Sequence, residues 1–87
     1  MADLEQLLDF PCSYTIKVLG KAETELVALV QEVVLRHAPE SVGEPDVRPS
    51  SKGRFVSVNL RFEVAQAGQL YAIHEELNQS PLVSLIL

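Results

Sequence analysis

One stretch of this chain constrains the fold more than any other. From Val56 to Val64 every second residue is apolar, and polar or charged residues alternate with them. The alternating residues are Ser57, Asn59, Arg61 and Glu63. A strict period of two predicts a long β-strand with one face in a core and the other facing solvent or a partner. Directly before it, the tetrad 50–53 has turn chemistry, so residues 45–64 are expected to form a hairpin.

The rest of the chain predicts an α+β fold. A strand is expected over 14–19, a helix over 23–36, a second helix over 65–78, a last strand over 82–87 and a short lead-in helix over 3–8. The order β-α-β-β-α-β predicts a ferredoxin-like split sandwich, in which a four-stranded antiparallel sheet carries both helices on one face. All 87 residues are expected to form this one domain.

The sheet face that points away from the helices is the predicted functional surface. Alternation assigns to it Thr15, Lys17, Leu19, Ser57, Asn59, Arg61, Leu82, Ser84 and Ile86. This mixture is neither a core nor a fully polar surface. Such faces meet ligands, nucleic acid or a second copy of the chain, and a plain solvated surface with scattered apolar residues explains the pattern equally well.

The turn before the long strand is a candidate anion site. Its two hydroxyls, its ammonium and its flexible glycine come from Ser50, Ser51, Lys52 and Gly53. An ordinary hairpin turn with solvated side chains accounts for the same residues. The full candidate set for binding a ligand or partner is Lys17, His37, Ser50, Ser51, Lys52, Gly53, Ser57 and Arg61.

Nucleic-acid binding is not expected. The stretch 52–58 invites comparison with the RNA-binding signature on the third strand of this topology, but Arg54 and Val56 occupy the places of the stacking aromatic residues. The net charge of −5 also repels a phosphate backbone.

Enzymatic activity, a cofactor and a metal are not expected either. The residues His37, His74 and Cys12 are far apart in sequence, and no catalytic grouping of carboxylates or of serine and histidine is present. The lone Cys12 fits a reducing compartment. No signal peptide is recognised, and the apolar segment 26–35 is too short to cross a bilayer, so a cytoplasmic protein without membrane association is expected.

Three pieces of the sequence resemble the YbeD-like family of small bacterial proteins of uncharacterised function. They are Leu8-Asp9-Phe10-Pro11 with 14–20, Arg36-His37-Ala38-Pro39, and Arg48-Pro49-Ser50-Ser51-Lys52-Gly53 with Phe55 and Ser57. Phe55 departs from the family pattern, where a tyrosine is expected. The resemblance implies a βαββαβ fold similar to the amino-acid-sensing ACT regulatory domains, and a loose association with lipoate metabolism. It implies no established activity.

The resulting hypothesis is a small, non-enzymatic, cytoplasmic regulatory or binding module that recognises a small anionic metabolite. The alternative is a protein-interaction adaptor without a small ligand. Analogy with ACT-like domains makes Gly20 and the start of the first long helix second candidates for a ligand position. Self-association as a homodimer is expected to use the sheet face or an edge strand.

Overall fold

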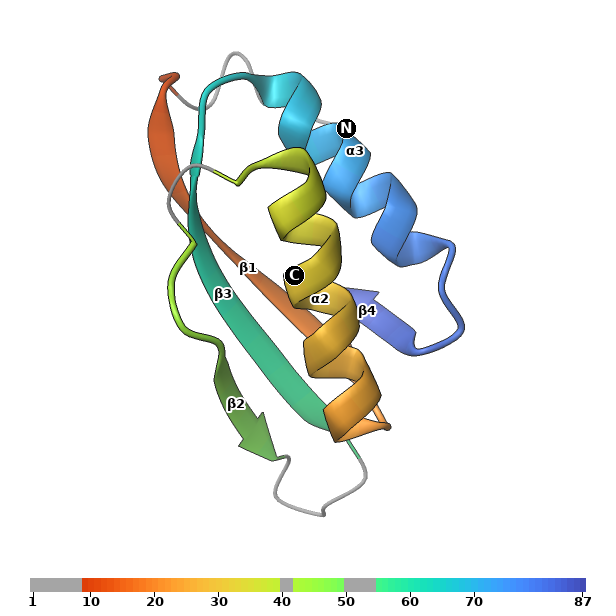
Figure 1. The fold of residues 1–87 in the computed structure, drawn as a ribbon. Coiled ribbons are helices and arrows are strands. Elements are labelled where there is room, and N and C mark those ends of the chain that lie inside the picture. The colour runs from red at the N-terminus through yellow and green to blue at the C-terminus, as the bar shows by residue number, and fades with distance from the viewer. Residues whose placement is uncertain (1–8, 40–41, 50–54) are drawn as a thin grey trace.

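The computed structural model describes residues 9–39, 42–49 and 55–87. Its elements are β1 (Cys12–Gly20), α2 (Glu23–His37), β2 (Asp46–Pro49), β3 (Val56–Val64), α3 (Ala67–Asn78) and β4 (Val83–Ile86). The sheet has the order β2-β3-β1-β4 with antiparallel neighbours, and both helices cover one of its faces (Figure 1). The predicted ferredoxin-like arrangement is therefore confirmed. The predicted lead-in helix over 3–8 lies outside the described residues.

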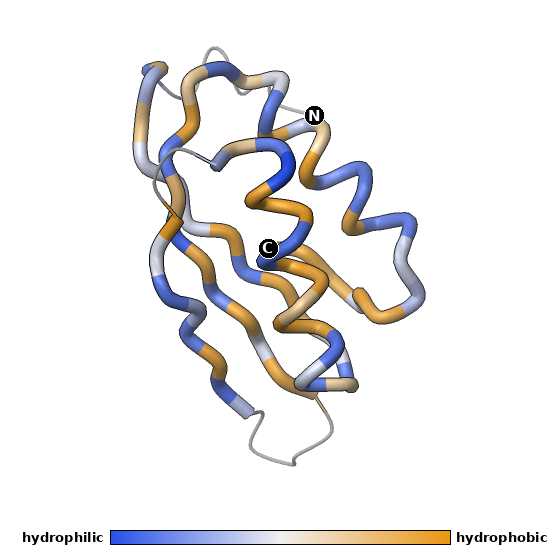
Figure 2. The backbone as a smooth tube through the Cα atoms, viewed as in Figure 1, coloured by the Kyte–Doolittle hydropathy of each residue, from blue (hydrophilic) through white to orange (hydrophobic). Residues whose placement is uncertain are grey.

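Strand β3 is the centre of the sheet and has the predicted bounds. It pairs with β1 along its whole length, from Cys12 opposite Val64 to Gly20 opposite Val56, and its other edge pairs with β2. Every second residue of β3 is buried: Val56, Val58, Leu60, Phe62 and Val64. Figure 2 shows the corresponding alternation of apolar and polar residues along the strand. One face of β3 thus belongs to the core, and the other is left for solvent or a ligand.

The two helices close the core from one side. Their buried residues are spaced three and four apart, as on one face of a helix: Leu26, Val30, Val33 and Val34 on α2, and Leu70, Ile73 and Leu77 on α3. Neither described helix is long and apolar enough to cross a membrane.

The second helix begins two residues later than the sequence pattern predicts. Gln66 has an extended backbone and acts as the N-cap, and the Gln69 side-chain oxygen accepts hydrogen bonds from the N–H groups of Ala65 (2.7 Å) and Gln66 (3.1 Å). This capping box supplies acceptors to N–H groups that lack partners in the helix. Glutamine is not among the preferred N-cap residues, so the sequence gives little signal for this boundary.

The predicted phase of the last strand is wrong from Leu85 onward, whereas Val83 packs against the core as predicted. Ile86 lies opposite the buried Val18, and both Ile86 and Leu82 pack against the core instead of facing outward. Leu85 lies opposite Leu19, which places its side chain on the outer face. The register of β4 against β1 shifts between Leu19 and Gly20. The side chains of β4 that point outward are therefore determined by its pairing with β1 and not by its amino-acid composition.

Candidate ligand-binding face of the sheet

The registers of the four strands arrange the outer face as rows of neighbouring side chains. In strand order, the first row is Arg48, Ser57, Leu19 and Leu85. The second row is Asp46, Asn59 and Lys17, and the backbone N–H of Leu87 donates to the Lys17 carbonyl at 2.8 Å, so Leu87 continues this row. The next rows pair Arg61 with Thr15 and Glu63 with Ser13. The predicted residues Lys17, Ser57 and Arg61 therefore share one face.

Charge is distributed unevenly between the two sides of the molecule. Among the described residues, the outer face carries three of the chain's seven lysines and arginines: Lys17, Arg48 and Arg61. The helices carry the exposed glutamates Glu23, Glu25, Glu32 and Glu75. The outer face also carries Asp46 and Glu63, so its described charges nearly balance, whereas the described charges of the helices are mostly negative. An anion is therefore repelled less on the sheet side than on the helix side.

A shallow hollow of about 170 Å³ lies at the first row. It is lined by Lys17, Leu19, Arg48, Pro49, Phe55, Val56 and Ser57. Two cations and one hydroxyl are the donors of this hollow, and no carboxylate lines it. Such donors favour an anion, because charge-assisted hydrogen bonds are stronger than neutral ones.

The donors of this hollow are available to a ligand to different degrees. The Lys17 ammonium has no side-chain partner in the part of the chain that the structure describes. The Arg48 Nε donates to Asp46 Oδ2 at 3.1 Å, but both side chains are more than half exposed, so this pair contributes little stability. The Ser57 Oγ accepts a hydrogen bond from Asn59 Nδ2 at 3.4 Å, which leaves the hydroxyl proton free to turn toward a ligand.

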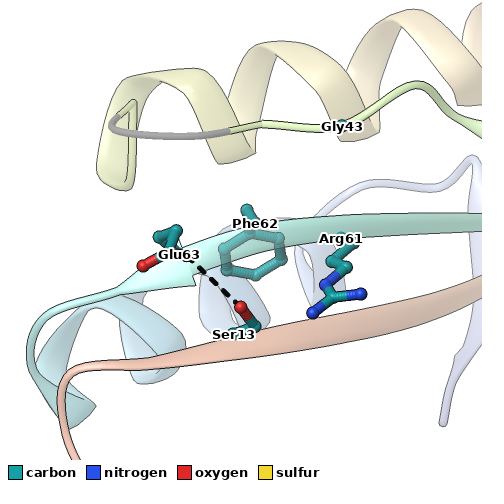
Figure 3. A pocket seen from close by; sticks show the side chains of 5 residues that line it. All are labelled: Ser13, Gly43, Arg61, Phe62 and Glu63. Carbon is teal, nitrogen blue, oxygen red and sulfur yellow. Dashed lines mark hydrogen bonds between the residues drawn. The ribbon is translucent and has the colours of Figure 1, made fainter.

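A second hollow, of about 280 Å³, lies further along the same strands. It is lined by Ser13, Gly43, Arg61, Phe62 and Glu63 (Figure 3). The Ser13 Oγ donates to Glu63 Oε1 at 3.3 Å. The hollow is lined by the acidic Glu63 as well as by Arg61, so it suits an anion less well than the smaller one. The structure therefore separates Arg61 from the hollow that holds Lys17 and Ser57.

His37 lies in the helix layer, away from the outer face of the sheet. Its Nε2 is 2.8 Å from Glu76 Oε1, and the Arg36 guanidinium also donates to the Glu76 carboxylate. The Gln69 Nε2 donates to the His37 carbonyl at 3.0 Å. These contacts join the end of α2 to α3, and they explain the position of His37 without a ligand.

The turn residues of the predicted set lie outside the described residues. These are Ser50, Ser51, Lys52 and Gly53. Their described neighbours in sequence, Pro49 and Phe55, both line the smaller hollow. Arg48 also lines this hollow, although it is not in the set predicted from sequence. The alternation Asp46-Val47-Arg48, with only Val47 half-buried, is the signal that could have placed Arg48 on the outer face.

The helix-layer contacts predict a pH dependence of stability. The hydrogen bond from His37, and next to it the one from Arg36, hold the pKa of Glu76 below its ordinary value. A lowered carboxyl pKa stabilises the fold above the ordinary pKa, and the stabilisation is lost as the pH falls through the folded value. We expect Glu76→Gln to lower the free energy of unfolding at about pH 7 and to lower it less at about pH 3.

Urea unfolding at the two pH values measures this effect, with Glu75→Gln as the control. Glu75 is exposed and adjacent in sequence, and it forms no ion pair with another described residue. Burial lowers the pKa of His74, so acid also destabilises the fold through this histidine, and all three proteins share that background. An equal loss for Glu76→Gln at both pH values would contradict the electrostatic explanation.

Comparison with known proteins identifies the family. The sequence model of DUF493, described as a protein of unknown function, matches residues 5–87. The chain belongs to the DUF493 family. UPF0250 proteins of Photorhabdus laumondii and of Yersinia pestis (strain Pestoides F) are each 48% identical, over 84 and 86 residues, and each match covers 97% of this chain and 95% of the relative. The predicted resemblance to the YbeD-like proteins is confirmed.

A solved structure supports the fold independently. The solution structure of protein HP0495 from H. pylori matches with a TM-score of 0.77 at 17% identity, covering 92% of this chain and 85% of the other. At this identity the similarity establishes the fold alone.

Proposed function

We propose that this DUF493 protein is a non-enzymatic regulatory module that binds a small anionic metabolite on the open face of its sheet. The observation that carries the proposal is the smaller hollow, which Lys17, Arg48 and Ser57 line. The Asp46 carboxylate pairs with the exposed Arg48 but does not line the hollow. The free thiol of Cys12 agrees with a cytoplasmic location.

The three side chains have complementary roles in this proposal. Arg48 offers a planar fork that matches two oxygens of a carboxylate or phosphate, whereas Lys17 offers a compact charge. Ser57 stands beside Arg48 in the first row and orients the anion through its hydroxyl. Because all three project from paired strands, no backbone rearrangement is needed when a ligand binds, which favours affinity.

Thermal unfolding in the presence of anions tests the proposal. Inorganic phosphate, acetate and citrate are compared with potassium chloride at equal ionic strength. A bound anion is expected to raise the melting temperature of the parent protein with concentration, since a ligand at about 100 times its Kd adds about 2.7 kcal/mol. Lys17→Gln and Arg48→Gln are each expected to weaken binding about tenfold to hundredfold, as for a lost charged hydrogen bond.

The matched control is Arg36→Gln, which removes the same charge from the helix layer. Only the ligand-dependent increment is compared, because Arg36 pairs with Glu76 and contributes to the fold itself. The proposal fails if none of the anions raises the melting temperature of the parent. It also fails if Arg36→Gln reduces the increment as much as Lys17→Gln does.

A further inference from the structure

We propose that the anion bound at the smaller hollow carries an apolar chain or ring, which packs on a leucine strip beside the cations. The leucine strip consists of Leu19, Leu85 and Leu87. This inference rests on the proposed function, because it specifies the chemical class of the ligand for the same site. The proposed ligand is an amphiphilic anion.

The leucine strip is continuous with the anion site. Leu19 lines the hollow itself, and Leu85 lies opposite it on β4. Leu87 lies beside Lys17, whose carbonyl accepts its N–H. Lys17 and Leu19 are two residues apart on β1, so their side chains are neighbours on one face. A ligand held by Lys17 and Arg48 would therefore extend over leucine side chains as it leaves the hollow.

Two of the three leucines of the strip are more exposed than large apolar side chains usually are. Leu85 is 51% exposed and Leu87 is 60% exposed, and among the described residues the other exposed large hydrophobics are Leu35 and Tyr71 on the helices. Single exposed apolar residues are ordinary, but a cluster is a feature of binding surfaces. Each methylene buried against such a surface stabilises a complex by about 0.8 kcal/mol, which is about fourfold in affinity.

Charge distinguishes an anionic amphiphile from a second copy of the chain. Lys17 lies beside the strip, and Arg48 lies beyond Ser57 in the same row as Leu19 and Leu85. The Lys21 ammonium lies 5.5 Å from the ring centroid of Phe55, which lines the same hollow. Two copies meeting through the leucine strip would bring their Lys17 ammonium groups close together at a cost, because Lys17 lies beside the strip. The carboxylates of this face, Asp46 on β2 and Glu63 at the other end of β3, lie away from the strip. An anion with an apolar body neutralises the cations and covers the leucines in one step.

The test compares two probes with the same head group. Butanesulfonate and octanesulfonate are titrated by calorimetry into the parent protein, below the micelle concentration of the longer probe. Octanesulfonate is expected to bind at least about tenfold more tightly, which corresponds to fewer than two of its four additional methylenes being fully buried. Lys17→Gln is expected to weaken both probes, because both present the same anionic head.

Leu85→Ser and Leu35→Ser form a matched pair of variants that measures how much the leucine strip contributes to the affinity for octanesulfonate. Leu85 and Leu35 have nearly the same exposure, 51% and 50%, but Leu35 lies on α2 in the helix layer. Leu85→Ser is expected to reduce the affinity gain of octanesulfonate over butanesulfonate by about threefold or more. Leu35→Ser is expected to leave both affinities unchanged.

The outcomes separate this inference from the proposed function. Equal affinity for the two sulfonates overturns the amphiphile inference alone, since the anion site would still bind its head group. No binding of either sulfonate, together with no effect of phosphate, acetate or citrate on the melting temperature, overturns both. A concentration-dependent dimer that Leu85→Ser dissociates, detected by light scattering, would show that a second copy covers the strip and also overturns the inference.

Discussion

Replacement of Leu60 by alanine is expected to lower the free energy of unfolding by about 2–5 kcal/mol. Leu60 is fully buried in the middle of β3, opposite the fully buried Ile16 of β1. Truncation removes the transfer free energy of three carbon atoms and leaves a cavity, because strands paired on both edges cannot collapse into it. Since domains of this size have about 5–15 kcal/mol of stability, this one change removes a large share.

Leu35→Ala provides the matched comparison for Leu60→Ala. The chemical change is the same, but Leu35 is half exposed on the outer side of α2. Its replacement is expected to change the free energy of unfolding by no more than about 0.5 kcal/mol, as for other surface substitutions. Urea unfolding with a common m-value measures both variants. Similar losses at the two positions would show that β3 does not have the central position in the core described above.

The bounds of β3 and the fold class could be predicted from sequence because one strand repeats a single pattern over nine residues. Apolar and polar residues alternate without exception from Val56 to Val64, so only one phase is compatible with a buried face. β1 has a weaker pattern at its start. The structure extends it to Cys12 because β3 offers a pairing partner as far as Val64, and this partner is not visible in the sequence around Cys12.

The phase of β4 could not be predicted from its own residues. Five of the six residues from Leu82 to Leu87 are apolar, so either phase places apolar side chains on both faces. The structure selects the phase through the pairing of Ile86 with Val18 and through the register shift at Gly20. The consequence is functional as well as structural, because this phase puts Leu85 and Leu87, and not Ile86, beside Lys17 on the outer face.

The sequence predicts which face of the sheet carries the candidate residues, but it does not predict which of them are neighbours across the strands. Alternation placed Lys17, Ser57 and Arg61 on one side of the sheet, as the structure does. Only the strand registers show that Arg48 is the neighbour of Ser57 and that Arg61 belongs to a different hollow. His37 is the last residue of α2, and sequence alone could not show that Glu76 of α3 would be its partner.

Replacement of Gly20 by alanine is expected to destabilise the protein by about 1–3 kcal/mol, which is the usual cost of overpacking. An added Cβ would lie 2.3 Å from the Leu82 carbonyl oxygen and 2.8 Å from a methyl carbon of Leu26. The Leu26 side chain can rotate away, but the Leu82 backbone can move only if the entry into β4 moves. The φ of Gly20 is outside the left-handed region, so lack of space alone causes the strain.

Gly68→Ala is the control for Gly20→Ala. Gly68 is on α3, and an added Cβ there has no atom within 4 Å, so alanine is expected to stabilise the helix by up to about 1 kcal/mol. Chemical unfolding measures both variants, and amide hydrogen exchange at Leu87 reports whether β4 is displaced, since its N–H donates to β1. Faster exchange at Leu87 in Gly20→Ala, with a matching loss of octanesulfonate affinity, would link this glycine to the leucine strip. Unchanged stability in Gly20→Ala would show that β4 does not approach β1 this closely.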